Sequence, residues 1–245
     1  MSNGIYELNL AGHTLRYAFR RVRTKYFFLP LLHRSASEGW DIKMTAEDLA
    51  RARIASPPQY TEAYAEYRGL LAPTARALQA FDCCIFHAAA IVTQGGCWLL
   101  AAPSGTGKTT QYRNWLRLHP GELGIISGDM PVLELRQDGV WVHPSPWNGK
   151  ERYRGFEPAK LAGVVLLRQG SENCIEFLEP RQAIPPLFGQ LAALPDTEAQ
   201  TRAVCRIMDG VLRSAACWQY TNRGDDDSTE LLREKIRRED ERRGV

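Results

Sequence analysis

The first seventy residues carry only a weak pattern of apolar and polar positions. Residues 5–10 (IYELNL) and 40–45 (WDIKMT) alternate in the manner of short strands. The segment TAEDLARAR predicts a helix that begins after Thr45, because a capping residue precedes helical spacing. We therefore expect a small N-terminal lobe of mixed structure over residues 1–72.

The pattern sharpens in the next stretch of the chain. Residues 59–80 predict helix with an interruption near Pro73. They are followed by two apolar runs, CCIFHAAAIV at 83–92 and CWLLAAP at 97–103, separated by TQGG. Continuous apolar runs bounded by a glycine turn are typical of two buried strands in a hairpin.

The rest of the chain alternates between helical and strand patterns. Residues 108–119 have helical spacing, GIIS at 124–127 predicts a short buried strand, and 132–143 predicts a hairpin with Asp138 and Gly139 at its turn. Further strands are expected at 162–170, 173–179 and 216–222, and helices at 196–214 and 228–238. The prediction is an α/β domain over residues 73–245, with a mixed, strand-rich sheet.

Composition changes this picture little. A chain of 245 residues suits one domain with a smaller appended lobe. Its 31 basic and 28 acidic residues are interspersed and leave a net charge of +3, which gives no argument for a nucleic-acid partner. The tail REKIRREDERRGV is interpreted as a solvated helix end rather than a binding arm.

Cysteine usage and hydropathy favour a soluble, cytoplasmic protein. The six cysteines form no CxxC pair or Cys/His cluster, and several lie in apolar runs, as expected of a reduced protein. The N-terminus lacks a basic segment followed by an apolar one, so no signal peptide is expected. The longest apolar stretch, 85–102, is interrupted by polar residues and glycines, so no membrane partner or bilayer span is expected.

Residues 98–116, WLLAAPSGTGKTTQYRNWL, carry the clearest chemistry. A phosphate cradle needs consecutive backbone N–H groups, glycines that leave space, and a helix N-terminus facing the anion. This segment supplies all three between a strand and a helix, with Lys108 placed for the β- and γ-phosphates and the Thr109 hydroxyl for Mg²⁺. The expected nucleotide-binding residues are Ser104, Gly105, Thr106, Gly107, Lys108, Thr109 and Thr110. The plainer alternative is a glycine-rich turn that caps a helix.

Ala102 and Asp129 affect how this loop is interpreted. Ala102 stands where the general phosphate-loop pattern begins with glycine, which either fits a backbone of negative φ or marks a subgroup of the fold. Phosphoryl transfer also requires an acid near the metal, usually at the end of a neighbouring strand. Asp129, in IISGDM, has that context; the alternative is an ordinary turn aspartate.

The order FHAAAIV…GG…LLAAPSGTGKTT…IISGDM…VHPSPWNGKE resembles the HPr kinase/phosphorylase-like kinases, relatives of the ATP-dependent phosphoenolpyruvate carboxykinases. It looks closest to the short members found beside genes for peptide modification, including those that phosphorylate lasso peptides. The similarity covers about residues 81–179, and CWQYTNRGDDDSTELL fits the way such chains end. The resemblance implies a P-loop core of the HPr kinase/carboxykinase type.

The resemblance also implies Mg-ATP-dependent phosphoryl transfer to a hydroxyl, with Ser or Thr of a peptide or small protein as acceptor. Carried over by position, Asp129 is both near the metal and placed as the base, and His87 lines the phosphate or acceptor side. From its apolar surroundings alone, His87 is more often a satisfied core histidine than a catalytic one, and the resemblance makes the two interpretations about equal. Lys150 and Arg152, in HPSPWNGKER, are candidates for a cationic phosphate or substrate clamp, or else solvated charges.

Two departures from the family narrow this expectation. HPr kinases generally have two adjacent acids where this chain has Gly128-Asp129-Met130, so a division of base and metal duties between two carboxylates is in question. The family's second signature segment, linked to the reverse reaction, is absent, and the much longer carboxykinases carry further ligands. Neither phosphorylase nor carboxykinase activity is expected. HPr kinases assemble into rings, which leaves a homo-oligomer open.

Two other functions remain open from the sequence. One is a kinase for a small metabolite such as free serine or a sugar. The other is a catalytically weak, nucleotide-dependent binding or regulatory module, kept open by Met130 in place of a second acid. A transporter-type ATPase is disfavoured because no LSGGQ-like segment follows the loop.

Overall fold

The computed structural model describes residues 4–29, 31–34, 38–103, 105–149, 155 and 157–244. The chain divides into two compact units. One consists of Met1–Ile85 and Ala192–Val204, and the other of Phe86–Leu191 and Cys205–Val245.

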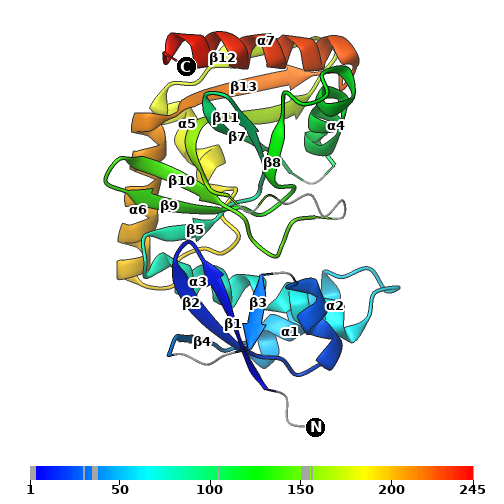
Figure 1. Ribbon diagram of the computed structural model, residues 1–245, viewed down its shortest axis with the longest axis vertical. Helices are drawn as coiled ribbons and strands as arrows, with labels where there is room; N and C mark the ends of the chain where they lie inside the picture. The colour runs from blue at the N-terminus through cyan, green and yellow to red at the C-terminus, as the bar shows by residue number, and fades with distance from the viewer. Residues whose placement is uncertain are drawn as a thin grey trace. The chain divides into compact units, whose positions relative to one another are not determined.

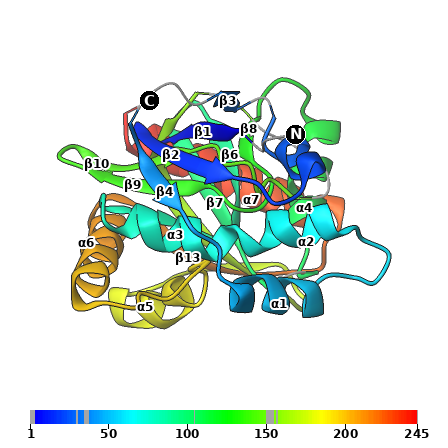
Figure 2. The ribbon, with the colours of Figure 1, turned by 90° about the horizontal axis from the view of Figure 1, so that it is seen from below.

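The first unit contains a four-stranded sheet in the order β3-β1-β2-β4 (Figure 2). The strands are β1 Ile5–Leu10, β2 His13–Ala18, β3 Leu32–Arg34 and β4 Trp40–Ile42. The predicted strand at 5–10 is confirmed, and the one at 40–45 is shorter than expected. Ala11 and Gly12 join β1 to β2 with φ values of 50° and 81°, the backbone that a two-residue hairpin turn requires.

Helices complete the first unit. They are the 3₁₀ helix η1 Val22–Phe27, α1 Ala46–Ile54, α2 Glu62–Gly69 and α3 Leu71–Gln79, followed by the short strand β5 Cys83–Ile85. Thr45 caps α1 as predicted, in a reciprocal capping box with Asp48. The break between α2 and α3 falls at Leu70 rather than at Pro73. Pro73 lies in the first turn of α3, where its missing N–H removes no intrahelical bond.

The second unit is built on a mixed sheet (Figure 1). Its strands are β6 Ala88–Thr93, β7 Gly96–Ala101, β8 Gly124–Ser127, β9 Val132–Arg136, β10 Gly139–His143, β11 Ala159–Gln169, β12 Cys174–Phe177 and β13 Ala216–Asn222. Within this unit the order is β9-β10-β11-β7-β6-β8, with β13 beside β11 and β12 beside β13. Strand β11 runs parallel to both β7 and β13, and the other described strand pairs of this sheet are antiparallel. The expected mixed, strand-rich α/β architecture is confirmed.

The helices of this part of the chain are α4 Lys108–Leu118, α5 Pro180–Phe188, α6 Glu198–Ser214 and α7 Asp226–Arg242. Three of them agree with the sequence pattern. Helix α5 was not expected, because prolines such as Pro180, Pro185 and Pro186 usually interrupt a helix. A capping box between Glu179 and Gln182 starts this helix in spite of them.

Two of the expected strand boundaries were wrong. The run at 83–92 is not one strand but β5 and β6, because Phe86 and His87 donate their backbone N–H groups to Pro131 and Gln190 rather than continuing one ladder. The β9–β10 hairpin turns one residue earlier than expected, since Arg136 pairs directly with Gly139.

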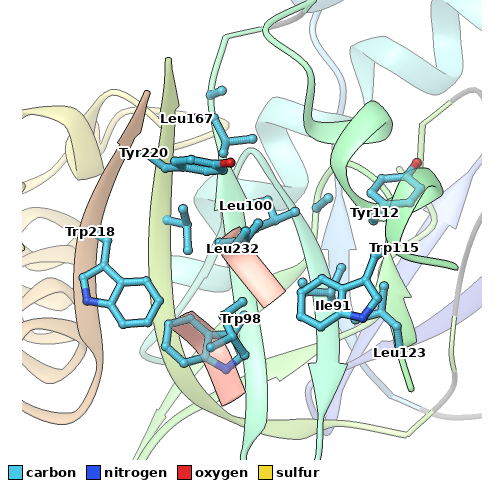
Figure 3. Close-up of a cluster of buried hydrophobic side chains, with 14 of the residues drawn as sticks. Ile91, Trp98, Leu100, Tyr112, Trp115, Leu123, Leu167, Trp218, Tyr220 and Leu232 are labelled. Atoms are coloured by element: carbon cyan, nitrogen blue, oxygen red, sulfur yellow. The ribbon is translucent and has the colours of Figure 1, made fainter. Parts of the chain in front are cut away.

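Helices α4 and α7 pack on one face of this sheet (Figure 3). The largest members of the core are Ile91, Trp98, Leu100, Tyr112, Trp115, Leu167, Trp218, Tyr220 and Leu232. The Trp98 and Trp218 rings lie 4.6 Å apart. The Trp98 ring crosses β11 at Gly163, where an added Cβ would stand 2.0 Å from a ring carbon. Glycine at this position is therefore required by packing.

The C-terminal helix is more than a solvated end, contrary to expectation. Its Leu232 and Ile236 are buried, and Asp240 is only 7% exposed. The Asp240 carboxylate accepts hydrogen bonds from the Thr93 hydroxyl at 2.7 Å and from Trp98 Nε1 at 3.2 Å. Helix α7 is thus fastened to the β6–β7 hairpin.

The described residues include no helix long and apolar enough to cross a membrane. All six cysteines belong to the described part of the chain and are free thiols. Burial raises the pKa of the Cys84 and Cys97 thiols, and it raises that of Cys217 to about 11.

Candidate functional site

Strand directions bring three chain segments to one edge of the sheet. Strand β6 runs antiparallel to β7, so that Ala88 at the start of β6 pairs with Ala101 at the end of β7. Strand β8 runs antiparallel to β6, with Ser127 at its end opposite Ala90. The residues that follow β7, precede β6 and follow β8 therefore converge, and these are the segments of the glycine loop, His87 and Asp129.

The glycine loop leads directly into α4. Gly105 and Gly107 have φ values of 85° and 108°, and Gly107 occupies the N-cap position of the helix. Thr106 is turned back on the loop, since its hydroxyl donates to the Pro103 carbonyl at 2.9 Å. Because glycine has no capping side chain, the N–H groups of the first turn of α4 are left for another acceptor. Ser104 lies outside the described residues.

Ala102 adopts a backbone that alanine tolerates. Among the described non-glycine residues only Ala11 and Asp82 have positive φ, so Ala102 does not need glycine's freedom. Its carbonyl accepts a hydrogen bond from Lys108 Nζ at 2.6 Å. The residue that departs from the general pattern thus contributes its backbone to holding the lysine.

Lys108 is a buried cation whose immediate partners are backbone carbonyl oxygens and a histidine nitrogen. It is 7% exposed, and besides Ala102 its ammonium contacts His87 Nε2 at 3.1 Å. Burial lowers the pKa of Lys108 from its ordinary 10.5, and the nearby Asp129 carboxylate partly offsets this. An ammonium group whose burial is incompletely compensated is typical of functional sites.

His87 connects Lys108 to Asp129. Its Nε2 lies 3.2 Å from Asp129 Oδ1, and the two side chains are 24% and 34% exposed. The backbone fixes both residues, since His87 N–H donates to the Gln190 carbonyl at 2.7 Å and Ala88 N–H to the Asp129 carbonyl at 2.8 Å. Both contacts use His87 Nε2, which accepts from Lys108 in one tautomer and donates to Asp129 in the other, so the three side chains form one polar cluster.

The two threonines of the loop differ in surroundings. Thr109 is half-buried, and Tyr112 Oη donates to its hydroxyl at 3.5 Å. Thr110 is exposed on the following position of α4. Only Thr109 is therefore held by another side chain.

A buried loop at residues 145–149 supports the Asp129 turn, a role that sequence reasoning missed. The Ser145 hydroxyl donates to the Met130 carbonyl and accepts from Trp147 N–H. A Cβ added to Gly128 would stand 2.7 Å from the Asn148 carbonyl oxygen. The signal available was the pair of prolines and the Trp in this segment; Lys150 and Arg152, which follow it, lie outside the described residues.

Residue 128 has no room for a side chain. Because the Asn148 carbonyl occupies the space of a side chain at Gly128, any larger residue there would require the loop to move. The described residues include no group of three or more His, Cys, Asp or Glu side chains that could hold a metal ion.

The chain matches no protein-family model, and it matches no curated protein. Among solved structures, the chain is similar to the HPr(Ser) kinase/phosphatase from Coxiella burnetii, with 8% sequence identity and a TM-score of 0.31. The matched region covers 65% of this chain and 96% of the Coxiella chain. Likeness at this level does not establish a shared fold. The function proposed below therefore depends on this chain's own residues.

Proposed function

We propose that this protein is a Mg-ATP-dependent kinase that transfers the γ-phosphoryl group to a hydroxyl, namely Ser or Thr of a peptide or small protein. The observation that supports it most is the chain of contacts Lys108–His87–Asp129 beside a glycine loop that opens a helix. A buried cation, a loop suited to phosphate and a reachable carboxylate are the parts that phosphoryl transfer requires.

The glycine loop fits a phosphate group. A Cβ added at Gly105 or at Gly107 meets no atom of the described residues within 4 Å, so these residues leave space beside the loop. The N–H groups of the loop and of the first turn of α4, together with the Lys108 ammonium, would hold phosphate oxygens. Thr109 and Asp129 offer the hard oxygen ligands that Mg²⁺ prefers. When bound, Mg-ATP supplies the phosphoryl group and neutralises its charge.

Asp129, Lys108 and His87 have different roles in the proposed transfer. Asp129 accepts the proton of the acceptor hydroxyl, because a carboxylate at the open end of the site is the nearest base. Lys108 stabilises negative charge from the buried end. His87 Nε2 lies within hydrogen-bond distance of both groups, and when it donates to Asp129 it limits movement of the carboxylate.

Met130 in place of a second acid keeps one alternative open, a nucleotide-dependent binding module with little turnover. With one carboxylate where the kinases that the sequence resembles have two, metal binding and proton removal both depend on Asp129. A module of this kind would bind nucleotide through the loop and recruit a partner without transferring phosphate.

The proposal is tested by incubating the protein with γ-labelled ATP, Mg²⁺ and candidate peptides. We expect label in a peptide, lost in Lys108→Ala and in Asp129→Asn. Removal of a general base typically lowers the rate by about 10²- to 10⁴-fold. Matched controls are Lys160→Ala and Asp138→Asn, an exposed pair 3.4 Å apart outside the site, which should keep full activity.

The other outcomes separate the alternatives. Label in free serine or a sugar but in no peptide would make this a small-metabolite kinase. Nucleotide binding without transfer to any acceptor would favour the binding module. Thr109→Ala should lose Mg-dependent nucleotide binding, and unchanged binding in that variant would contradict the assignment of the loop.

A further inference from the structure

Strand β12 lies at an edge of the sheet of the second unit (Figure 1). Among the strands that the structure describes, it pairs with β13 alone. An edge strand presents main-chain N–H and C=O groups with which an extended peptide can pair. Cys174, Glu176 and Phe177 of this strand are exposed, and Phe177 is 63% exposed. The described residues therefore leave the strand accessible to a partner.

The register of the β12–β13 pair decides which backbone groups reach this free edge of β12. Leu178, the residue after β12, donates its N–H to the Cys217 carbonyl at 2.9 Å. Hydrogen-bonded positions alternate in an antiparallel pair, so Glu176 also bonds to β13. The N–H and C=O groups of Ile175 and Phe177 are therefore directed away from β13, toward the free edge.

A basic hollow lies beside the Phe177 end of this strand. It has a volume of about 410 Å³ and is formed by the end of α6, the beginning of β13 and the last turns of α7. Its described lining contains four cations and one carboxylate, namely Arg213, Lys235, Arg242, Arg243 and Glu239. The hollow therefore has an excess of positive charge and attracts anionic groups.

The protein neutralises these cations only in part. The Glu239 carboxylate lies 2.6 Å from Arg242 Nη2 and 3.5 Å from Arg243 Nε, so two guanidinium groups share one carboxylate. Lys235 Nζ lies 5.4 Å from the centre of the Trp218 ring, which attracts a cation without cancelling its charge. The lining therefore suits a ligand that brings further carboxylates.

The basic hollow is separate from the glycine loop. Strands β7, β11 and β13 are parallel, and the loop follows the end of β7 at Ala101. Ala216, which lines the hollow at the start of β13, lies at the level of Trp98, because both residues pair with Gly163. The hollow is thus toward the other end of the strands, and a ligand there leaves the site of Asp129 open.

We propose that the free edge of β12 and the basic hollow together dock an acidic, extended segment of the peptide that the kinase phosphorylates. The inference rests on the proposed function and favours a peptide as its acceptor. Pairing with Ile175 and Phe177 supplies main-chain hydrogen bonds, and carboxylates of the segment meet the cations of the hollow. Because Phe177 stands opposite Trp218, every second side chain of the segment faces the hollow.

The test measures binding of fluorescein-labelled peptides by fluorescence anisotropy. One peptide alternates Glu with Val, and its control alternates Lys with Val. The acidic peptide should bind at least about tenfold more tightly, and the difference should shrink as salt screens the charges. The same acidic peptide methylated at alternate backbone nitrogens keeps its charge but loses main-chain donors, so it should bind about 3- to 10-fold more weakly.

A matched pair of double variants tests the charges of the hollow. Arg213→Ala/Arg242→Ala removes two side chains that are 79% and 73% exposed, and it should weaken the acidic peptide by about 3- to 10-fold. Arg117→Ala/Arg237→Ala removes the same charge from outside the hollow, at side chains 57% and 49% exposed, and should bind as the wild type does. Thermal unfolding verifies that each variant is folded.

A second pair of variants tests the free edge of β12. Phe177→Pro removes an outward N–H group, a change that an edge strand tolerates. It should weaken the acidic peptide by about 3- to 10-fold more than Phe177→Val, which keeps that N–H group.

Several results would overturn the proposal. Equal binding of the acidic and basic peptides, or full affinity in Arg213→Ala/Arg242→Ala, would remove the hollow from the docking surface. Full affinity of the methylated peptide or of Phe177→Pro would remove the free edge of β12. Binding of phosphatidylserine vesicles without binding of the acidic peptide would make the hollow a membrane contact instead.

Label transfer separates this proposal from the proposed function. A Ser-containing extension of the acidic peptide should be phosphorylated, with KM raised about 3- to 10-fold and kcat unchanged in Arg213→Ala/Arg242→Ala. Equal transfer to Ser peptides with and without the acidic segment would overturn the docking proposal and leave the proposed function standing. Selective binding of the acidic peptide without transfer to any acceptor would contradict the proposed function and leave the docking surface standing.

Discussion

Lys108 and Asp240 are two charged residues of the second unit with the same exposure, 7%, and opposite surroundings. Asp240 is enclosed. Each of its carboxylate oxygens accepts a hydrogen bond, one from Thr93 and one from Trp98, and Gly95 packs so closely that an added Cβ would stand 2.2 Å from Oδ1. A buried charge satisfied in this way holds two elements together.

Lys108 is buried but not enclosed. Its partners are a carbonyl oxygen and a histidine nitrogen, and the loop beside it has open space at Gly105 and Gly107. Burial lowers the pKa of Lys108 from 10.5, which means that the ammonium is incompletely stabilised.

The comparison shows that equal burial can serve stability or function. Each oxygen of the Asp240 carboxylate has a donor from the protein, so its removal should damage folding and leave chemistry intact. Among the described residues no carboxylate is in direct contact with the ammonium of Lys108, so its removal should damage chemistry and leave folding intact. Substitutions at the two positions should therefore have opposite effects on turnover and on the free energy of unfolding.

Replacing Lys108 by Met should abolish phosphoryl transfer and preserve the fold. The loss of one preorganised charge in such sites lowers turnover by about 10²- to 10³-fold. Exchanging a poorly stabilised buried ion for an apolar side chain of similar length should leave the free energy of unfolding unchanged or raise it by about 1 kcal/mol. Label transfer and urea unfolding measure the two effects. A large loss of stability would assign Lys108 a structural role.

Gly95→Ala should be strongly destabilising. The new methyl group would overlap the Asp240 carboxylate and displace it from Thr93 and Trp98, and overpacking of this kind typically costs about 3 kcal/mol. Thermal and urea unfolding measure the loss. Gly4→Ala is the control, because a Cβ at Gly4 meets no atom within 4 Å. Equal stability of the two variants would disprove the close packing of α7 on the hairpin.

Asp240→Ala should cost about 2 kcal/mol of unfolding free energy, from two hydrogen bonds to a charged group. Turnover of the folded protein should not change, since Asp240 lies outside the site. In the double variant Gly95→Ala/Asp240→Ala the two losses should fall short of their sum, because the shortened side chain makes room for the methyl group. Strict additivity would count against a direct contact.

The smallest expected effect is a pH dependence of stability. The pKa of Lys108 is lower in the folded chain than its ordinary 10.5, so the unfolded chain binds more protons just below that pH. Stability contributed by this group therefore rises as pH increases toward 10.5. Any stability advantage of Lys108→Met should shrink between about pH 7 and about pH 10 in urea unfolding. A widening advantage would mean that the ammonium is favoured by the fold.

Much of the second unit could be predicted from local pattern. The strands at 124–127 and 216–222 begin and end where the apolar runs do, and α4 begins at Lys108 after the glycine turn. The predicted strand boundaries were wrong where the hydrogen-bond partners of the backbone are distant in sequence. The separation of β5 from β6 depends on acceptors at Pro131 and Gln190, which no local pattern reveals.

The candidate site likewise has a part that local sequence predicts and a part that only strand pairing places. The glycine loop, Lys108, Thr109 and Asp129 could be nominated from residue types and spacing, because a phosphate cradle is made by consecutive residues. Sequence alone left His87 equally well a core histidine. The antiparallel pairing of β6 with β7 and β8 is what brings it to Lys108 and Asp129.

By itself the sequence determined the features that depend on neighbours along the chain: the Thr45 cap, the alternating strands and the loop glycines. Turn and helix hydrogen bonds link residues only a few positions apart, so residue order is sufficient to predict them. Only the tertiary structure decided that Asp240 reaches Thr93 and Trp98, more than 140 positions away, and that the Asn148 carbonyl fills the space beside Gly128. Such contacts depend on strand register and helix packing, which no local pattern encodes.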